Sequence, residues 1–249
     1  MSGVAQALYR YLPLLLIAAL WEALTRLGVI SDLVLPPLSS VVASLVDLVR
    51  GDLFYHTGAS LVRGATGLGL AIVVGSGLGI LMAWVRPIRI AFNPIVQLFY
   101  PIPKSALIPI MMIWLGFGDA SKIMVIFLGC MLPVTVSAFN GARGVDRVLI
   151  WSARSLGATR SEVLREVIAP AAMPEILAGI RTALALSFLL LVSAELMISR
   201  EGLGFLISNF GDAGLYNRMF AVVLTVSALG FAADRAYLAL TRRVLAWRE

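Results

Sequence analysis

The side chains that most often carry out chemistry in enzymes are scarce in this chain. It has one cysteine, Cys130, inside an apolar run, and one histidine, His56, in a loop. A single cysteine excludes an intrachain disulfide and a cysteine metal cluster. A lone histidine in a loop is far more often solvated than catalytic, so serine–histidine catalysis has little support.

The lysines and glycines do not form a nucleotide site. The two lysines, Lys104 and Lys122, follow a proline and a serine, and neither stands in the Gly-Lys-Ser/Thr ending of a phosphate-binding loop. The GSGLG run at 75–79 has no strand before it and lies within an apolar segment, which favours helix packing. We therefore expect a chain that is not an enzyme, does not hydrolyse ATP by itself and holds no cofactor or metal.

The composition indicates a protein that spans a membrane. Of its 249 residues, 60% are hydrophobic and 14% are charged, and the mean hydropathy is +0.94. A soluble domain of this length could not bury so much apolar surface. The net charge of +6 does not indicate a nucleic-acid partner, because the arginines stand singly at the ends of apolar runs.

Six apolar segments are near or above the ~20 residues that cross a bilayer, which predicts an all-α integral membrane protein with about six transmembrane helices. The first lacks a cleavage site and is interpreted as a retained span. Basic residues are about twice as frequent on one side, which predicts cytoplasmic N- and C-termini. The segments are Tyr11–Ile30, Gly64–Val85, Ile88–Leu115, Ile123–Phe139, Ile176–Ile198 and Met219–Leu240.

Local patterns describe how these segments pack. Glu22 and Arg26, four residues apart, predict an ion pair on one helix face. The run after Pro36–Pro37, LSSVVASLVDLV, predicts an amphipathic helix on or near the membrane surface. A ridge of small residues in the second segment predicts close approach of another helix. It consists of Gly67, Ala71, Gly75 and Gly79.

The third segment is expected to be broken by its prolines, Pro94, Pro101, Pro103 and Pro109. Proline removes intrahelical hydrogen bonds, and a charge near the break is costly unless it faces protein or a water-lined path. For Lys104 a role in such a path and a structural role are equally open, and the same holds for Glu195. Serines in membrane helices commonly bond backbone carbonyls, so they are weaker candidates. The hypothetical translocation path comprises Lys104, Ser137, Asn140, Ser187 and Glu195.

The one long polar interval, residues 141–175, predicts a helical hairpin between two spans. Residues 146–156 are expected to form a helix that ends at Gly157. Thr159 and Glu162 have the spacing of a capping box at the start of a second helix. We expect that helix to end near Ile168, with Pro170 and Pro174 closing the unit. The two helices should pack through apolar stripes, Val145, Val148, Leu149 and Leu156 on one and Val163, Leu164 and Val167 on the other.

This hairpin resembles the coupling motif of membrane subunits of ATP-binding-cassette importers. That motif is E-A-A, three residues, G, nine residues, I-x-L-P. Ala153 and Gly157 hold the places of the second alanine and the glycine, and Pro170 holds that of the proline. The departures are Trp151 for Glu, Ser152 for the first Ala, Val167 for Ile and Ala169 for Leu. The resemblance implies that coupling to the ATPase involves Ser152, Ala153, Arg154, Leu156, Gly157, Ala158 and Pro170.

Three further stretches are similar to the branch of this family that imports nitrate, sulfonates, taurine and related compounds. They are YPIPKSALIPIMMIWLGFGDASKI, SLGA and AELMISREGLGFLI. The resemblance implies the type I importer permease fold over residues 1–249 as a single domain, in a bacterial cytoplasmic membrane. It also implies a second permease copy, two cytoplasmic ATPases that hold ATP and Mg, and an external solute-binding protein. Relatives that carry thiamine precursors, riboflavin or aromatic acids leave the substrate open.

Two other classes of protein are weighed against this one. An ATP-independent secondary transporter or channel would need a complete coupling site within the chain, and the sequence offers scattered candidates without an internal repeat. An intramembrane enzyme would need a His or Cys constellation, which the sequence lacks. Both alternatives are therefore weaker than an importer permease.

Overall fold

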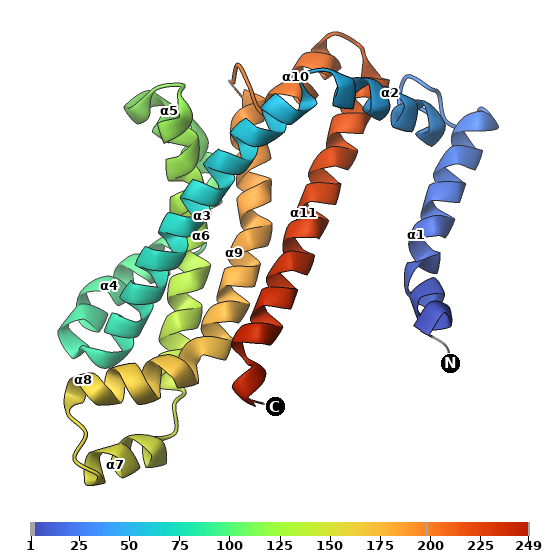
Figure 1. Cartoon of the computed structure of the whole chain (residues 1–249). Coiled ribbons are helices and arrows are strands. Elements are labelled where there is room, and N and C mark those ends of the chain that lie inside the picture. Colours follow the sequence, from blue (N-terminus) through green and yellow to red (C-terminus); the bar gives the residue numbers. More distant parts are fainter. Residues whose placement is uncertain (1–2, 198, 249) are drawn as a thin grey trace.

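The computed structural model describes the backbone of residues 3–197 and 199–248 and the side chains of residues 12–197 and 199–247. Every regular element among them is a helix, which confirms the all-α prediction. The long helices run side by side, with α2 and α10 across one end, here called the α2 end, and α7 and α8 at the other, the hairpin end (Figure 1). The helices are α1 (Gly3–Arg26), α2 (Leu38–Arg50), α3 (Leu53–Trp84), α4 (Arg86–Phe99), η1 (Lys104–Ala106), α5 (Leu107–Leu115), α6 (Asp119–Arg143), α7 (Arg147–Ser155), α8 (Arg160–Glu162), η2 (Val163–Ile168), α9 (Ala169–Met197), α10 (Leu203–Asp212), α11 (Tyr216–Val244) and η3 (Ala246–Arg248).

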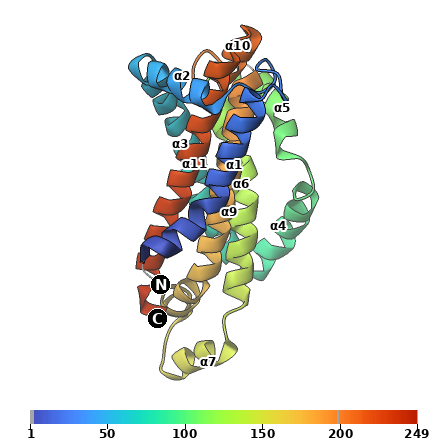
Figure 2. The same cartoon turned by 90° about the vertical axis from the view of Figure 1, so that its right-hand side faces the viewer.

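Four helices in the described part of the chain are long and apolar enough to cross a membrane: α3, α6, α11 and a continuous helix over 160–197. The pair α4 and η1–α5, bent by 90°, is a broken fifth span or a re-entrant loop, and it bows out from the bundle (Figure 2). The first expected span falls on α1. The break lies at residues 100–103, whereas Pro94 and Pro109 lie inside helices.

The centre of the fold is the packing of α6 between α3 and α9. The predicted ridge of small residues on α3 contacts α6: Ala71 is fully buried, and a Cβ added at Gly75 would lie 2.9 Å from the Met131 carbonyl oxygen. On the other side of α6, Gly179 of α9 packs directly on Ser137. Small residues on both neighbours let the three helix backbones approach closely, as association in lipid requires.

The variant Gly79→Leu should destabilise this packing strongly. A Cβ added at Gly79 would lie 2.6 Å from Ala138 Cβ and would also meet backbone atoms of α6, which cannot move aside. Overpacking of this kind costs about 1–3 kcal/mol or more. Gly77→Leu is the matched control, because an added Cβ there meets nothing within 4 Å. Thermal unfolding in detergent checks the prediction, and equal melting temperatures for the two variants would contradict it.

The α2 end ties α1 to the rest of the fold. The predicted ion pair forms, with Arg26 Nε 2.5 Å from Glu22 Oε1. The second oxygen of Glu22 accepts from the Ser39 backbone N–H at 3.0 Å, which satisfies a free donor at the start of α2. Trp21 Nε1 donates to the Pro36 carbonyl at 2.9 Å. Toward the hairpin end, α1 stands apart from the other helices (Figure 1).

The hairpin has the predicted first helix, turn and capping box. Asp146 accepts from the Val148 backbone N–H at 2.9 Å at the start of α7. Gly157, beyond the end of α7, has φ +89°, the left-handed conformation that favours glycine. Thr159 and Glu162 then form the capping box, in which the Thr159 N–H donates to Glu162 Oε2 at 2.7 Å.

The second helix of the hairpin does not end near Ile168, so that prediction is wrong. The helix continues through Pro170 and Pro174 to Met197. The segment before Pro170, η2, is π-helical. In an α-helix the ring of Pro170 would clash with the carbonyl four residues earlier, and a wider turn relieves that clash. The prolines therefore change the local winding and do not close the unit.

The apolar stripe predicted on the first hairpin helix is also partly wrong. The inward face of α7 carries Ile150 and Ala153, which are three residues apart on one side of the helix and pack on the core. Val163 of the second helix is fully buried, as expected. Three of the four residues in the predicted stripe are exposed: Val148, Leu149 and Leu156.

Candidate functional site

The hairpin end presents an exposed apolar surface on α7, here called the α7 face. Val148 and Trp151 are each 61% exposed, Leu149 is 51% exposed and Leu156, just beyond the helix, is 87% exposed. An exposed apolar patch rimmed by polar residues is typical of a contact surface for another protein. The α7 face lies at the tip of the molecule, away from the helix bundle (Figure 1).

The residues predicted to couple to an ATPase divide between this face and the core. The turn at Gly157 is open, since an added Cβ would meet nothing within 4 Å. The exposed members are Ser152, Arg154, Leu156 and Gly157. The half-buried members are Ala153, Ala158 and Pro170.

One helix joins the hairpin to the opposite end of the molecule. The continuous helix begins at Arg160, directly after the turn at Gly157, and runs for 38 residues to Met197. The helix bends where η2 passes into α9, so its first part runs across the hairpin end and the rest enters the bundle (Figure 1). Because the helix continues through this bend, a rigid-body movement of the hairpin would be carried into the bundle.

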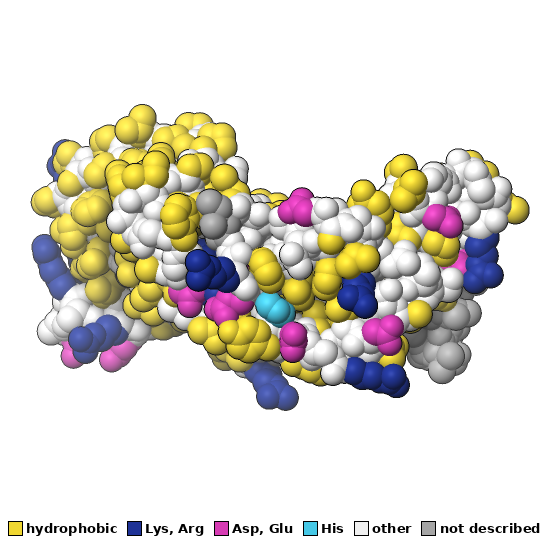
Figure 3. All heavy atoms as spheres, turned by 90° about the horizontal axis from the view of Figure 1, so that it is seen from above, with side chains coloured by type: hydrophobic (Ala, Val, Ile, Leu, Met, Phe, Trp, Pro, Cys, Tyr) yellow, Lys and Arg dark blue, Asp and Glu magenta, His cyan; other side chains and the backbone are white. Residues whose placement is uncertain are grey.

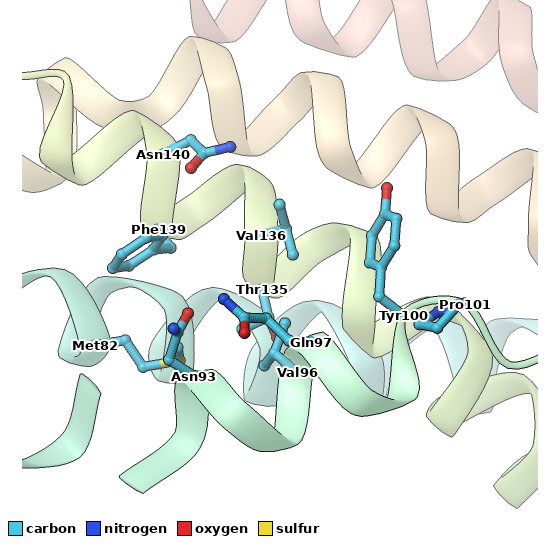
Figure 4. A pocket seen from close by; sticks show the side chains of 10 residues that line it. All are labelled: Met82, Asn93, Val96, Gln97, Tyr100, Pro101, Thr135, Val136, Phe139 and Asn140. Atoms are coloured by element: carbon cyan, nitrogen blue, oxygen red, sulfur yellow. The ribbon is translucent and has the colours of Figure 1, made fainter. Parts of the chain in front are cut away.

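A cavity of about 350 Å³ lies between α4 and α6. Asn93 and Gln97 project into it from α4, and Asn140 borders it on α6 (Figure 4). Met82 and Phe139 are among its apolar lining residues. None of the described residues that line it is charged. The cavity therefore offers neutral amide donors and acceptors beside apolar surface.

Lys104 binds the backbone at the break between α4 and α5. Its Nζ donates to the carbonyl oxygens of Phe99, Tyr100 and Ile102 at 2.9, 2.8 and 2.6 Å. These carbonyls lie at the end of α4, where no further backbone N–H groups of the helix are available to bond them. Lys104 thus caps the C-terminus of α4 next to the cavity and does not line it.

The other charged candidate, Glu195, belongs to an ionic cluster at the α2 end in which Arg63 and Glu195 are buried. Arg63, which is 3% exposed, lies 2.8 Å from Glu195, 2.6 Å from Glu201 and 2.6 Å from Asp119. Arg63 therefore joins α3 to α6, α9 and the loop before α10. Acidic and basic side chains are interspersed over this end of the molecule (Figure 3).

Glu195 is further satisfied by neutral donors. It accepts from the Ser60 hydroxyl at 2.8 and 2.9 Å and from the Gly204 backbone N–H at 3.0 Å, at the start of α10. The Leu203 N–H donates to Ser60 Oγ at 2.8 Å, and the Gly202 N–H donates to His56 Nδ1 at 3.0 Å. His56 was expected in a loop and solvated, and that prediction is wrong, because His56 lies in α3 and is buried. It accepts a hydrogen bond from the loop before α10, and the cluster fastens α10 to α3.

The structure does not bring the five translocation candidates together. Asn140 borders the cavity, whereas Lys104 caps α4 and Glu195 lies in the ionic cluster. Ser187 is buried and donates to the Leu184 carbonyl at 2.7 Å, within its own helix. Ser137 packs in the contact between α6 and α9.

Sequence reasoning missed Asn93, Gln97 and Arg63. The sequence does contain a pattern that points to the two amides, because a spacing of four residues places both on one face of a helix. It contains no such pattern for Arg63, since its partner Glu195 is 132 residues away in the chain. Within the described part of the chain, no group of His, Cys, Asp or Glu side chains could hold a metal ion.

Comparison with known proteins identifies the family to which this chain belongs. A sequence model of the "binding-protein-dependent transport system inner membrane component" family matches residues 75–246. The members are membrane components that bind no cofactor, and ATP is hydrolysed by a separate chain.

Relatives that match over nearly the whole chain are transport permeases. The taurine transport system permease protein TauC of Escherichia coli is 35% identical over 94% of this chain and 87% of its own. The putative aliphatic sulfonates transport permease protein SsuC of Bacillus subtilis is 37% identical over 94% of this chain and 85% of its own. The formylaminopyrimidine transport permease protein ThiX of Halalkalibacterium halodurans is 30% identical over 98% of this chain and 97% of its own.

A solved structure supports the fold. The MetNI methionine transporter, in an inward-facing conformation, matches with a TM-score of 0.66 at 20% identity, over 77% of this chain and 95% of that one. At this identity the likeness concerns the fold alone. The chain is therefore a multi-pass inner membrane permease and belongs to the family of binding-protein-dependent transport system inner membrane components.

Proposed function

We propose that this permease passes a small organic sulfonate, taurine or a close analogue, delivered by an external binding protein. The observation that carries the proposal is the likeness to TauC and SsuC, each over 94% of the chain. The uncharged, amide-bearing cavity between α4 and α6 is compatible with such a solute. A small solute of this kind fits in about 350 Å³.

The proposed site of coupling is the α7 face together with the turn at Gly157. An ATPase subunit would cover the exposed apolar side chains of α7, with Ser152, Arg154 and Leu156 at the contact. Closure of two ATPases on ATP would push two hairpins together and open the path outward, and hydrolysis would reset the inward state. The 38-residue helix from Arg160 to Met197 supports this mechanical role, because it joins the hairpin to the bundle without a break.

The proposed assembly contains two copies of this chain, each folded as one permease domain over residues 1–249. We place the hairpin end, with both chain termini, on the cytoplasmic side, where ATP is available. The α2 end would then face the binding protein. The apolar side chains of α1 from Leu14 to Ile17 are about 60% exposed, which suits contact with lipid or with the second copy.

The path is proposed to run past the cavity between α4 and α6. Of the five candidates from the sequence, Asn140 borders this cavity. Lys104 would act on it through the end of α4, and Glu195, Ser137 and Ser187 would hold the surrounding helices in place. The buried positions of Ser187 and Glu195 support that division.

A second candidate substrate is a formylaminopyrimidine, because ThiX matches over 98% of this chain. The two substrates differ in charge and shape, and the binding protein selects between them. Isothermal titration of the binding protein that serves this permease tests the choice. Tight binding of taurine or an alkanesulfonate is expected. Binding of a formylaminopyrimidine with no response to sulfonates would contradict the sulfonate assignment and favour the second candidate.

A further inference from the structure

The cavity between α4 and α6 is lined by hydrogen-bond donors that suit a sulfonate group. Asn93 and Gln97 lie on one face of α4, and Asn140 borders the same cavity at the edge of α6 that is farther from them (Figure 4). Gln97 and Asn140 are exposed and Asn93 is half-buried, so their amide groups are open to a solute. Each amide offers two N–H donors.

The hydroxyl of Thr135, which also lines the cavity, already donates to the Met131 carbonyl at 2.8 Å. The three amides and the Tyr100 hydroxyl are therefore the remaining side-chain donors that line the cavity. A group with several acceptor oxygens at tetrahedral angles, such as a sulfonate, can bind N–H donors from two helices at once. An alkyl chain attached to it would lie against Met82 and Phe139, which line the same cavity.

The end of α4 would by itself repel an anion. Tyr100 and Pro101 line the cavity where α4 ends, and the free carbonyls of a helix C-terminus carry partial negative charge. Lys104 Nζ donates to three carbonyls there, those of Phe99, Tyr100 and Ile102. The ammonium charge offsets the carbonyl dipoles beside the cavity without entering it.

We propose that this cavity is a transit site for the sulfonate group, held by the amide N–H groups of Asn93, Gln97 and Asn140, with Lys104 as a positioning residue. The proposal rests on the proposed function, that the solute is an organic sulfonate. Neutral donors suit transit because a path must bind its solute weakly enough to release it. A fixed cationic side chain in a low-dielectric cavity would hold the anion far more strongly.

The test uses the permease reconstituted in proteoliposomes with its own ATPase and with binding protein saturated with radiolabelled taurine. Gln97→Met and Asn93→Leu keep side-chain size and remove the donors. We expect uptake to fall roughly tenfold in each, because hydrogen bonds to a charged group are the strong ones. Gln97→Glu, nearly the same shape, places a negative charge in the cavity and should reduce uptake further.

The control is Thr66→Val, which keeps side-chain size and removes an exposed hydroxyl on α3 that donates within its own helix, to the Val62 carbonyl at 2.7 Å, and it should leave uptake unchanged. ATP hydrolysis without binding protein should be the same in all variants, which shows that they are assembled. Assembled Gln97→Met, Asn93→Leu and Gln97→Glu proteins that import taurine at the wild-type rate would overturn the transit site while leaving the proposed function intact. A wild-type complex that imports no sulfonate would overturn both.

Discussion

Replacing Gly157 with glutamate should abolish uptake while the permease still inserts in the membrane. Gly157 has φ +89°, a backbone angle that residues other than glycine adopt at a cost of about 1–2 kcal/mol. An added side chain would meet nothing within 4 Å of its Cβ, so it would project from the hairpin. It would place bulk and negative charge where the ATPase is proposed to dock. Co-purification of the ATPase with the permease measures docking, and solute uptake measures the consequence.

Gly116→Glu is a matched control for this prediction. Gly116 also has a positive φ, +78°, and open space around an added Cβ, but it lies between α5 and α6 at the other end of the molecule. It carries the same backbone strain and the same new charge. The ATPase should therefore co-purify with Gly116→Glu and not with Gly157→Glu. Normal co-purification and uptake in Gly157→Glu would refute docking at this turn.

Replacing Arg63 with methionine should cause the largest loss of stability. The change leaves Glu195, 1% exposed, without the guanidinium that lies 2.8 Å away. It also removes the ion pairs to Asp119 and Glu201. Removing one partner of a buried ion pair costs about 3–5 kcal/mol, because the remaining charge is buried without compensation. We expect a marked drop in the thermal unfolding temperature of the purified permease in detergent.

Two further variants separate this effect from a general loss of charge. Arg26→Met removes an arginine from an exposed pair with Glu22 and should change the unfolding temperature far less. Arg63→Met combined with Glu195→Gln removes both buried charges, so the double variant should be more stable than Arg63→Met alone. An unfolding temperature for Arg63→Met equal to that of the wild type would show that the cluster does not hold the α2 end together.

The features that sequence predicted well are those set by local spacing. The ridge through Ala71 and Gly75 follows from a period of four residues, and the capping box of Thr159 and Glu162 from a spacing of three. Gly157 was expected to end a helix and does so with the backbone angle that only glycine adopts freely. Such features need no knowledge of the rest of the chain.

The predictions that failed depend on packing with distant parts of the chain. The sequence predicts that the helix ends near Ile168, before Pro170, but a π-helical segment before Pro170 lets the helix continue. Leu149 is predicted to lie in the hairpin interior, whereas Ile150 and Ala153 pack on the core and Leu149 is exposed. Both outcomes are set by how α7 and α9 meet the bundle, which the local pattern of apolar residues does not specify.

The same distinction applies to the candidate site. Lys104 was singled out as a charge beside a helix break, and its three carbonyl partners are all within five residues. The cluster around Arg63 depends on residues from α3, α6, α9 and the loop before α10. No single stretch contains that information. Asn140, a candidate from sequence, borders the cavity, and its role in a path stays a prediction. Asn93 and Gln97 are recognised only once α4 and α6 are placed side by side.

The measurement that tests the account most directly is solute uptake into proteoliposomes that contain the purified permease, with each partner added or left out. We predict uptake of taurine or an alkanesulfonate only when three components are present together. They are the ATPase, ATP on the side of the membrane that carries the ATPase, and the loaded binding protein. Uptake should disappear in Gly157→Glu, whose hairpin cannot dock. Uptake driven by an ion gradient in vesicles without any ATPase would contradict the account and would identify a secondary transporter.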